Sequence, residues 1–164
     1  MRRRLLLTGM AATALAGCGF QLRQAPDFAF KSISIPGTGS SVGNELRRNL
    51  AATGKVDVAP AGAAPDKAEV ILDLLSEQRE KVVVGLNASG QVREFQLRSR
   101  FKFRLRTPQG RELIPETELS QQRDVSFNES AVLAKEAEEG LLYRDMQTDL
   151  VQQLMRRLAA VKSL

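Results

Sequence analysis

The chain of 164 residues contains no histidine, no tryptophan and a single cysteine, Cys18. Without histidine or a second cysteine it lacks the usual ligand sets of zinc and copper sites. The same absence excludes Ser–His and Cys–His nucleophilic catalysis, and one cysteine cannot form a disulfide within the chain. No suggestive pair of carboxylates points to acid–base chemistry. The sequence therefore predicts a non-enzymatic protein with no cofactor and no metal site.

The N-terminal residues have the features of an export signal. Three arginines at 2–4 precede a mostly apolar run over 5–14, which is shorter than the roughly 20 residues that span a bilayer. Leu15–Cys18 (Leu-Ala-Gly-Cys) matches the bacterial lipobox, in which the cysteine receives S-diacylglycerol and, after cleavage before it, an N-acyl chain. We expect Cys18 to be lipidated, because it is the one good nucleophile available. The alternative is an ordinary free or buried cysteine.

Composition favours one exported domain. Hydrophobic residues make up 43% of the chain, which is enough for a core. The net charge is +5, and removing the three arginines of the predicted signal, residues 1–17, leaves +2. The basic character therefore gives little support for nucleic-acid binding. We predict a cleaved signal at 1–17, a lipidated tether at 18–27 and a single domain at 28–164.

Periodicity and turn residues predict the elements of this domain. In order, we expect a strand over 28–35, a helix from Ser40 or Ser41 to Gly54, an extended segment at 56–58, a strand from 70 to 84 with a break near 77–80, a strand over 92–106 and its hairpin partner. A long helix should follow Asn128, with Gly140 as a candidate bend. Its apolar stripe should pack on the sheet: Leu133, Ala137, Leu141, Thr148, Val151, Leu154, Met155 and Leu158.

The strand predicted over 92–106 alternates apolar residues with basic ones. A three-residue loop at Pro108–Gly110 would pair Leu105 with Leu113, Lys102 with Glu116 and Arg100 with Glu118. Three basic residues find no acid in that register: Arg98, Arg104 and Arg106. Two interpretations remain open, a solvated face of cross-strand ion pairs or a surface that faces an anion.

The segment Gly37–Gly43 loosely imitates a dinucleotide-binding loop, because it is rich in glycine and opens a helix. Its spacing is not that of the fingerprint, and Pro36 precedes it. We therefore favour an ordinary strand–helix loop and keep a nucleotide binder or enzyme as a rival hypothesis.

Several segments together resemble the family of lipopolysaccharide-assembly lipoproteins called LptE. The resemblance rests on Cys18–Arg23, Glu45–Leu50, Gly90–Gln96, Leu133–Lys135 and Leu154–Leu158, which occur in the family's order. It implies an α+β two-layer sandwich, with two helices on one face of a four-stranded, mostly antiparallel sheet. It also implies a partner, the outer-membrane β-barrel LptD, which the lipoprotein plugs from the periplasmic side while the pair places lipopolysaccharide in the outer leaflet.

The resemblance also suggests basic residues that contact lipid phosphate. One position corresponds to Lys135; the other lies at a hairpin tip, where Ala88–Gly90 offers no base and Arg93 is the nearest. Gly19 after the lipidated cysteine suits delivery to the outer membrane. The alternative function is that of an accessory lipoprotein in a different envelope lipid-transport complex.

Overall fold

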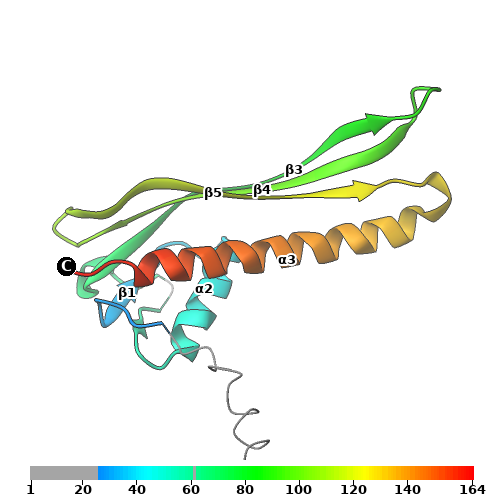
Figure 1. Ribbon diagram of the computed structural model, residues 1–164. Coiled ribbons are helices and arrows are strands. Elements are labelled where there is room, and N and C mark those ends of the chain that lie inside the picture. Colours follow the sequence, from blue (N-terminus) through cyan, green and yellow to red (C-terminus); the bar gives the residue numbers. More distant parts are fainter. Residues whose placement is uncertain (1–25, 61) are drawn as a thin grey trace, which may run out of the picture.

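The computed structural model describes residues 26–60 and 62–164, in which two helices lie on one face of a five-stranded sheet (Figure 1). The elements are β1 (Ser32–Ser34), α2 (Ser41–Ala52), β2 (Asp57–Val58), η2 (Pro65–Lys67), β3 (Val70–Leu86), β4 (Val92–Arg106), β5 (Glu112–Ser126), η3 (Glu129–Ala131) and α3 (Val132–Ala159). The two-layer α+β class is confirmed. The sheet has one strand more than the four predicted.

The additional strand makes the sheet mixed, with the order β2-β1-β3-β4-β5. β1 runs parallel to both β2 and β3, and two short bonds join β2 to β1: Asp57 N to Lys31 O at 2.7 Å and Ala59 N to Ile33 O at 2.9 Å. β1 covers only three of the residues predicted over 28–35. The preceding Phe28 and Phe30 contact each other at 5.3 Å between ring centroids, and Phe30 is buried in the core.

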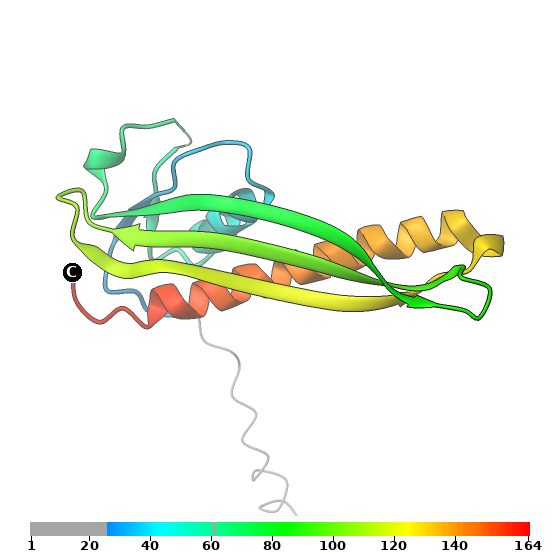
Figure 2. The same ribbon diagram turned by 90° about the horizontal axis from the view of Figure 1, so that it is seen from above.

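The strands β3, β4 and β5 form a long antiparallel meander, visible along its length in Figure 2. β4 has the predicted bounds. β3 is continuous through the break predicted near 77–80, because those residues pair with β4 and their side chains bond to the helices. Asn87–Gly90 is the expected turn: Asn87 Oδ1 accepts from the backbone N–H groups of Ser89 and Gln91, and Gly90 has a φ of 79°.

The β4–β5 register differs from the prediction beyond the first pairs of the hairpin. Arg106 faces Glu112, an acid that the prediction did not assign to it, and Leu105 faces Ile114, Lys102 faces Glu118 and Arg100 faces Ser120. The slip occurs in two irregular steps around Pro115. Proline has no N–H to give to a ladder and is tolerated in strands at edges and bulges, so the loop alone does not fix the pairing.

Helix α2 begins as predicted, because the Ser40 side chain accepts from the N–H of Gly43. Glu77 of β3 accepts from the hydroxyls of Ser40 and Ser41 at the same helix end, where a carboxylate is electrostatically favoured. Arg47 donates to the carbonyls of Ile35 and Gly37. These bonds are those of a capped strand–helix loop, the interpretation favoured for Gly37–Gly43.

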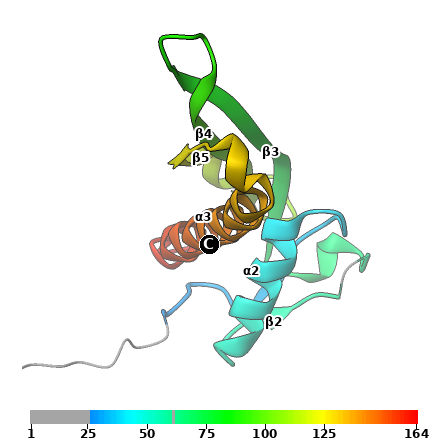
Figure 3. The same ribbon diagram turned by 90° about the vertical axis from the view of Figure 1, so that its right-hand side faces the viewer.

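Helix α3 is one continuous helix, and Asn128 caps the short turn η3 before it rather than α3 itself. Only its second half follows the predicted apolar stripe. Leu133, Ala137, Leu141 and also Thr148 are exposed. The buried residues are Met146, Leu150, Val151, Leu154, Met155 and Leu158. The cause is the position of α2, which runs across α3 rather than alongside it (Figure 1 and Figure 3). Its Ser41 and Glu45 bond to Gln147 and Thr148, in the second half of α3.

The hydrophobic core is concentrated at the end of the domain where β1, α2 and the second half of α3 meet. A smaller cluster of Leu97, Val125 and Met146 lies farther along the meander. We call the region beyond it, around the Asn87–Gly90 turn and the start of α3, the distal end. None of the helices in the described residues has the length and apolarity to cross a membrane.

Candidate functional site

The face of the sheet opposite the helices carries a row of basic residues from β4. The face of β4 toward the helices is buried, because Leu97, Phe101 and Phe103 point into the core. Strand alternation therefore places the intervening side chains on the helix-free face. We call these the basic row: Arg98, Arg100, Lys102, Arg104 and Arg106. Facing residues on β3 and β5 are polar or charged over most of its length, so this face is hydrophilic.

Asp73 of β3 joins the two arginines nearest the hairpin loop. Its Oδ2 lies 2.9 Å from Arg104 Nη2 and 2.8 Å from Arg106 Nε. Partial burial raises the pKa of Asp73, but the hydrogen bonds and charges of Arg106 and Arg104 outweigh it and hold the pKa below its usual value. Asp73 in turn raises the pKa of Arg106. The prediction that Arg104 and Arg106 have no acidic partner is wrong. Both bond to Asp73 of β3, and on β5 Glu112 faces Arg106 and lies 3.9 Å from Arg104.

Other acids neutralise the positive charges in the middle of the basic row. Arg100 pairs with Glu80 of β3 rather than with the predicted Glu118. Lys102 lies 3.8 Å from both Glu116, its predicted partner, and Glu118. Cross-strand ion pairs thus account for most of the basic row, as the first of the two interpretations predicted.

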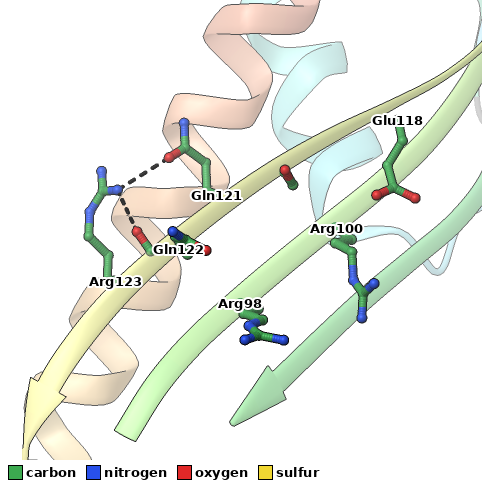
Figure 4. A pocket seen from close by; sticks show the side chains of 7 residues that line it. Arg98, Arg100, Glu118, Gln121, Gln122 and Arg123 are labelled. Atoms are coloured by element: carbon green, nitrogen blue, oxygen red, sulfur yellow. Dashed lines mark hydrogen bonds between the residues drawn. The ribbon is translucent and has the colours of Figure 1, made fainter. Parts of the chain in front are cut away.

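Arg98 differs from the rest of the row, because it forms no ion pair with any described residue. Its Nε donates to Gln96 Oε1 at 2.8 Å. The residue opposite Arg98 on β3 is Glu80, but the Glu80 carboxylate is bonded to Arg100. Arg98 and Arg100 line an open depression of ≈ 630 Å³, completed by residues 118 and 120–123 of β5 (Figure 4). The depression therefore holds one arginine whose charge has no acidic partner, which is suited to an anion.

Two other predicted residues, Lys135 and Arg93, lie toward the distal end. Lys135 donates to Ser126 Oγ at 3.1 Å and to Glu138 Oε2 at 2.8 Å. Arg93 is exposed, and its carbonyl accepts from the N–H of Phe127. The structure thus divides the predicted basic residues into the row on the outer sheet face and this distal pair. Cys18 lies outside the described residues.

Sequence reasoning missed Asp73 and Glu80, the acids that neutralise three arginines. A signal existed, because the Asn87–Gly90 turn implies that β3 pairs with β4. Counting back from that turn places Asp73 one residue out of register, since a bulge between Leu74 and Ser76 shifts the pairing. The acids could therefore be anticipated on β3, but not assigned to particular arginines.

A long antiparallel meander backed by one long helix, with a hydrophilic outer face, defines a class of two-layer α+β domains. Residues 24–158 match the family model described as LptE, lipopolysaccharide-assembly, so the chain belongs to the LptE family. A search of curated proteins gives no match.

Solved structures agree with this assignment. Uncharacterized lipoprotein B from Nitrosomonas europaea has 35% identity and a TM-score of 0.73 over 87% of this chain and 91% of that one. Two more share the fold. Rare lipoprotein B from Shewanella oneidensis has 19% identity and a TM-score of 0.64, covering 79% and 95% of the two chains. A minor lipoprotein from Acinetobacter baumannii has 18% identity and a TM-score of 0.62, covering 82% and 94%.

Proposed function

We propose that this chain is an outer-membrane lipoprotein that plugs an LptD-like β-barrel and assists the placement of lipopolysaccharide at the cell surface. The observation that carries the proposal is the hydrophilic outer face of the sheet. The lumen of an outer-membrane barrel is polar and partly hydrated, so a plug needs a charged surface there and a core sealed elsewhere. Membership of the LptE family supports the same partner.

In this proposal residues 1–17 are removed, Cys18 carries the acyl chains, and residues 18–27 tether the domain 28–164 to the periplasmic side of the membrane. Several acyl chains hold a protein far more firmly than one, since each buried CH₂ contributes roughly 0.8 kcal/mol. We expect Cys18→Ala to abolish the mass added by acylation and to release the chain from the membrane fraction. An unmodified mature wild-type chain would contradict the proposal.

The test of the partner is affinity purification of the full lipidated chain from detergent-solubilised outer membranes. Recovery of a large β-barrel in an equal molar amount supports the proposal. Recovery of a different envelope lipid-transport complex would favour the alternative function, and recovery of the chain alone would contradict both.

Lipopolysaccharide carries phosphates, and the structure distinguishes how the basic residues could bind them. Arg98 has no acidic partner to displace, whereas Arg104 and Arg106 already share Asp73. We expect Arg98→Gln to weaken lipopolysaccharide binding by tenfold or more, on the order of one charge-assisted hydrogen bond, and more than Arg104→Gln or Arg106→Gln does. Arg48→Gln, at an exposed position on α2, is the control of equal charge change. Binding that is unchanged at low salt in the triple variant of Arg98, Arg104 and Arg106 would exclude this surface.

Lys135 and Arg93 form a second proposed phosphate contact. Lys135 already forms an ion pair with Glu138, so a lipid phosphate must displace the Glu138 carboxylate. If Lys135 binds lipid, Glu138→Gln should strengthen binding and Lys135→Gln should weaken it. Unchanged binding in both variants would assign Lys135 a purely local role in the first turns of α3.

A further inference from the structure

The end of the domain opposite the distal end, which we call the proximal end, carries a group of exposed basic residues. Three segments meet there: η2, the loop between β4 and β5, and the end of α3 with the residues after it (Figure 2). The side chains of these basic residues form no ion pair and no hydrogen bond within the part of the chain that the structure describes. We call them the proximal cations: Lys67, Arg111, Arg156, Arg157 and Lys162.

An open depression joins two of these segments. Lys67 from η2 and Arg111 from the β4–β5 loop line a space of ≈ 520 Å³ together with Glu69 and Leu164. The carboxylate of Glu69 accepts a hydrogen bond from the backbone N–H of Lys31 at 2.6 Å. The two basic side chains of the depression therefore remain available to an anion from outside the domain.

The proximal cations differ in this respect from the basic row on the outer sheet face. In the basic row, acids on the neighbouring strands bond to Arg100, Arg104 and Arg106. The proximal cations come from turns and a helix end, where no strand ladder places acids opposite them. Exposed charges interact over about 8 Å at physiological ionic strength, so these cations act only on anions close to the proximal end.

The chain enters the domain at this same end (Figure 1). Pro26 is the first described residue, and Phe30, four residues later, is buried in the main core. The segment from the predicted lipidation site Cys18 to Pro26 spans at most about 30 Å when fully extended. An acyl anchor at Cys18 therefore keeps the proximal end within reach of the bilayer surface, wherever the distal end points.

We propose that the proximal cations bind anionic phospholipid headgroups of the leaflet that holds the acyl anchor. Each contact is weak, but the anchor makes binding intramolecular and so raises the local concentration of phosphates. The contact fixes the proximal end at the level of the headgroups, where a domain that plugs a barrel from the periplasmic side has one of its ends. This inference rests on the lipid anchor of the proposed function.

The test places the full lipidated chain in vesicles whose lipid headgroups carry a nitroxide quencher. The sulfur of Cys18 is blocked by its diacylglycerol, so a fluorophore can be attached to Gln109→Cys in the exposed β4–β5 loop. Ser89→Cys, in the turn at the distal end, is the positional control. We expect stronger quenching at position 109 in vesicles that contain anionic phosphatidylglycerol than in phosphatidylcholine alone, and a loss of this difference at high salt. Quenching at position 89 should not depend on vesicle charge.

Matched double variants identify the cations that bind. Lys67→Gln with Arg111→Gln removes one lysine and one arginine from the proximal end, and Lys102→Gln with Arg144→Gln removes the same charges elsewhere. The first pair should lower the ratio of headgroup-bound to free proximal ends about thirtyfold, since each basic residue near an anionic surface contributes about 1 kcal/mol. The control pair should leave this ratio near the wild-type value. Circular dichroism checks that both double variants are folded.

Equal quenching at position 109 in both kinds of vesicle overturns the inference and leaves the proximal cations to an acidic protein surface. An equal loss of quenching in the two double variants also overturns it, because net charge alone would then explain the binding. Neither result touches the proposed function, since affinity purification reports the barrel partner separately. If mass spectrometry of the same sample shows that Cys18 carries no acyl chain, both fail together.

Discussion

At the scale of single residues, Asp73 controls the charge of the outer sheet face. It holds Arg104 and Arg106 in place, while Arg98 is left without an acidic partner. One acid on β3 therefore separates arginines that stabilise the sheet from the arginine available to a ligand. The sequence alone could not make this distinction, because all three arginines have the same alternation on the same strand.

Replacing Asp73 by Asn should lower the free energy of unfolding by about 1–3 kcal/mol, because hydrogen bonds to a charged group are lost where two guanidinium groups remain. Urea denaturation at neutral pH measures the change. Asp145→Asn, at an exposed position on α3, is the control. Equal stabilities of the two variants would show that the Asp73 cluster contributes no more than an exposed charge.

The lowered pKa of Asp73 also predicts a pH dependence. A carboxyl group with a depressed folded-state pKa stabilises the fold fully above its unfolded value, near 3.8, and loses that contribution as pH falls through the folded value. The wild-type chain should therefore lose stability below about pH 4 more steeply than Asp73→Asn. Parallel acid unfolding curves for the two proteins would contradict this.

At the scale of elements, the position of α2 decides which part of the long helix α3 is packed. α2 crosses α3 at Gln147 and Thr148, so the second half of α3 is packed and several apolar residues of its first half are exposed. The periodic stripe of α3 is continuous in the sequence. Periodicity indicates which residues share a helix face, but not how far the packing partner extends.

Truncations along α3 should therefore have unequal effects. Leu150→Ala should cost about 2–5 kcal/mol, because it leaves a cavity in the core. Leu133→Ala, at a residue that is 82% exposed, should change stability by less than about 0.5 kcal/mol. Chemical denaturation of both variants tests this, and a large loss for Leu133→Ala would show that the distal half of α3 is packed in solution.

Tyr143 connects α3 to the β3 edge. Burial raises its pKa, and the nearby charge of Glu139 raises it further. A raised pKa means that the neutral phenol stabilises the fold below pH 10 and that this contribution is lost as pH rises through the folded value. Tyr143→Phe should cost about 1 kcal/mol at neutral pH and should weaken the alkaline loss of stability. An unchanged alkaline limb would contradict the assignment.

At the scale of the whole molecule, stability should decrease from the core toward the distal end. The main cluster contains Phe101, Phe103 and Leu105, whereas beyond the small cluster around Leu97 several apolar residues of β3 and α3 are exposed. A region with few buried contacts opens at a lower free energy than the core.

Amide hydrogen exchange followed by NMR measures this gradient. Protection should be high for Phe101, Phe103 and Leu105 and should fall toward Val92. Uniform protection along β4 would contradict the gradient.

The sequence by itself determined the elements and their order, because local patterns encode them. Alternation defined β4, Asn87–Gly90 defined its turn, Ser40 defined the start of α2, and the segments that resemble LptE indicated the family. The tertiary structure alone decided the strand register around Pro115, the ion pairs that leave Arg98 without an acid, and the exposure of the first half of α3. Each of these depends on which distant residue comes to lie opposite, and spacing along one strand or helix carries no information about that.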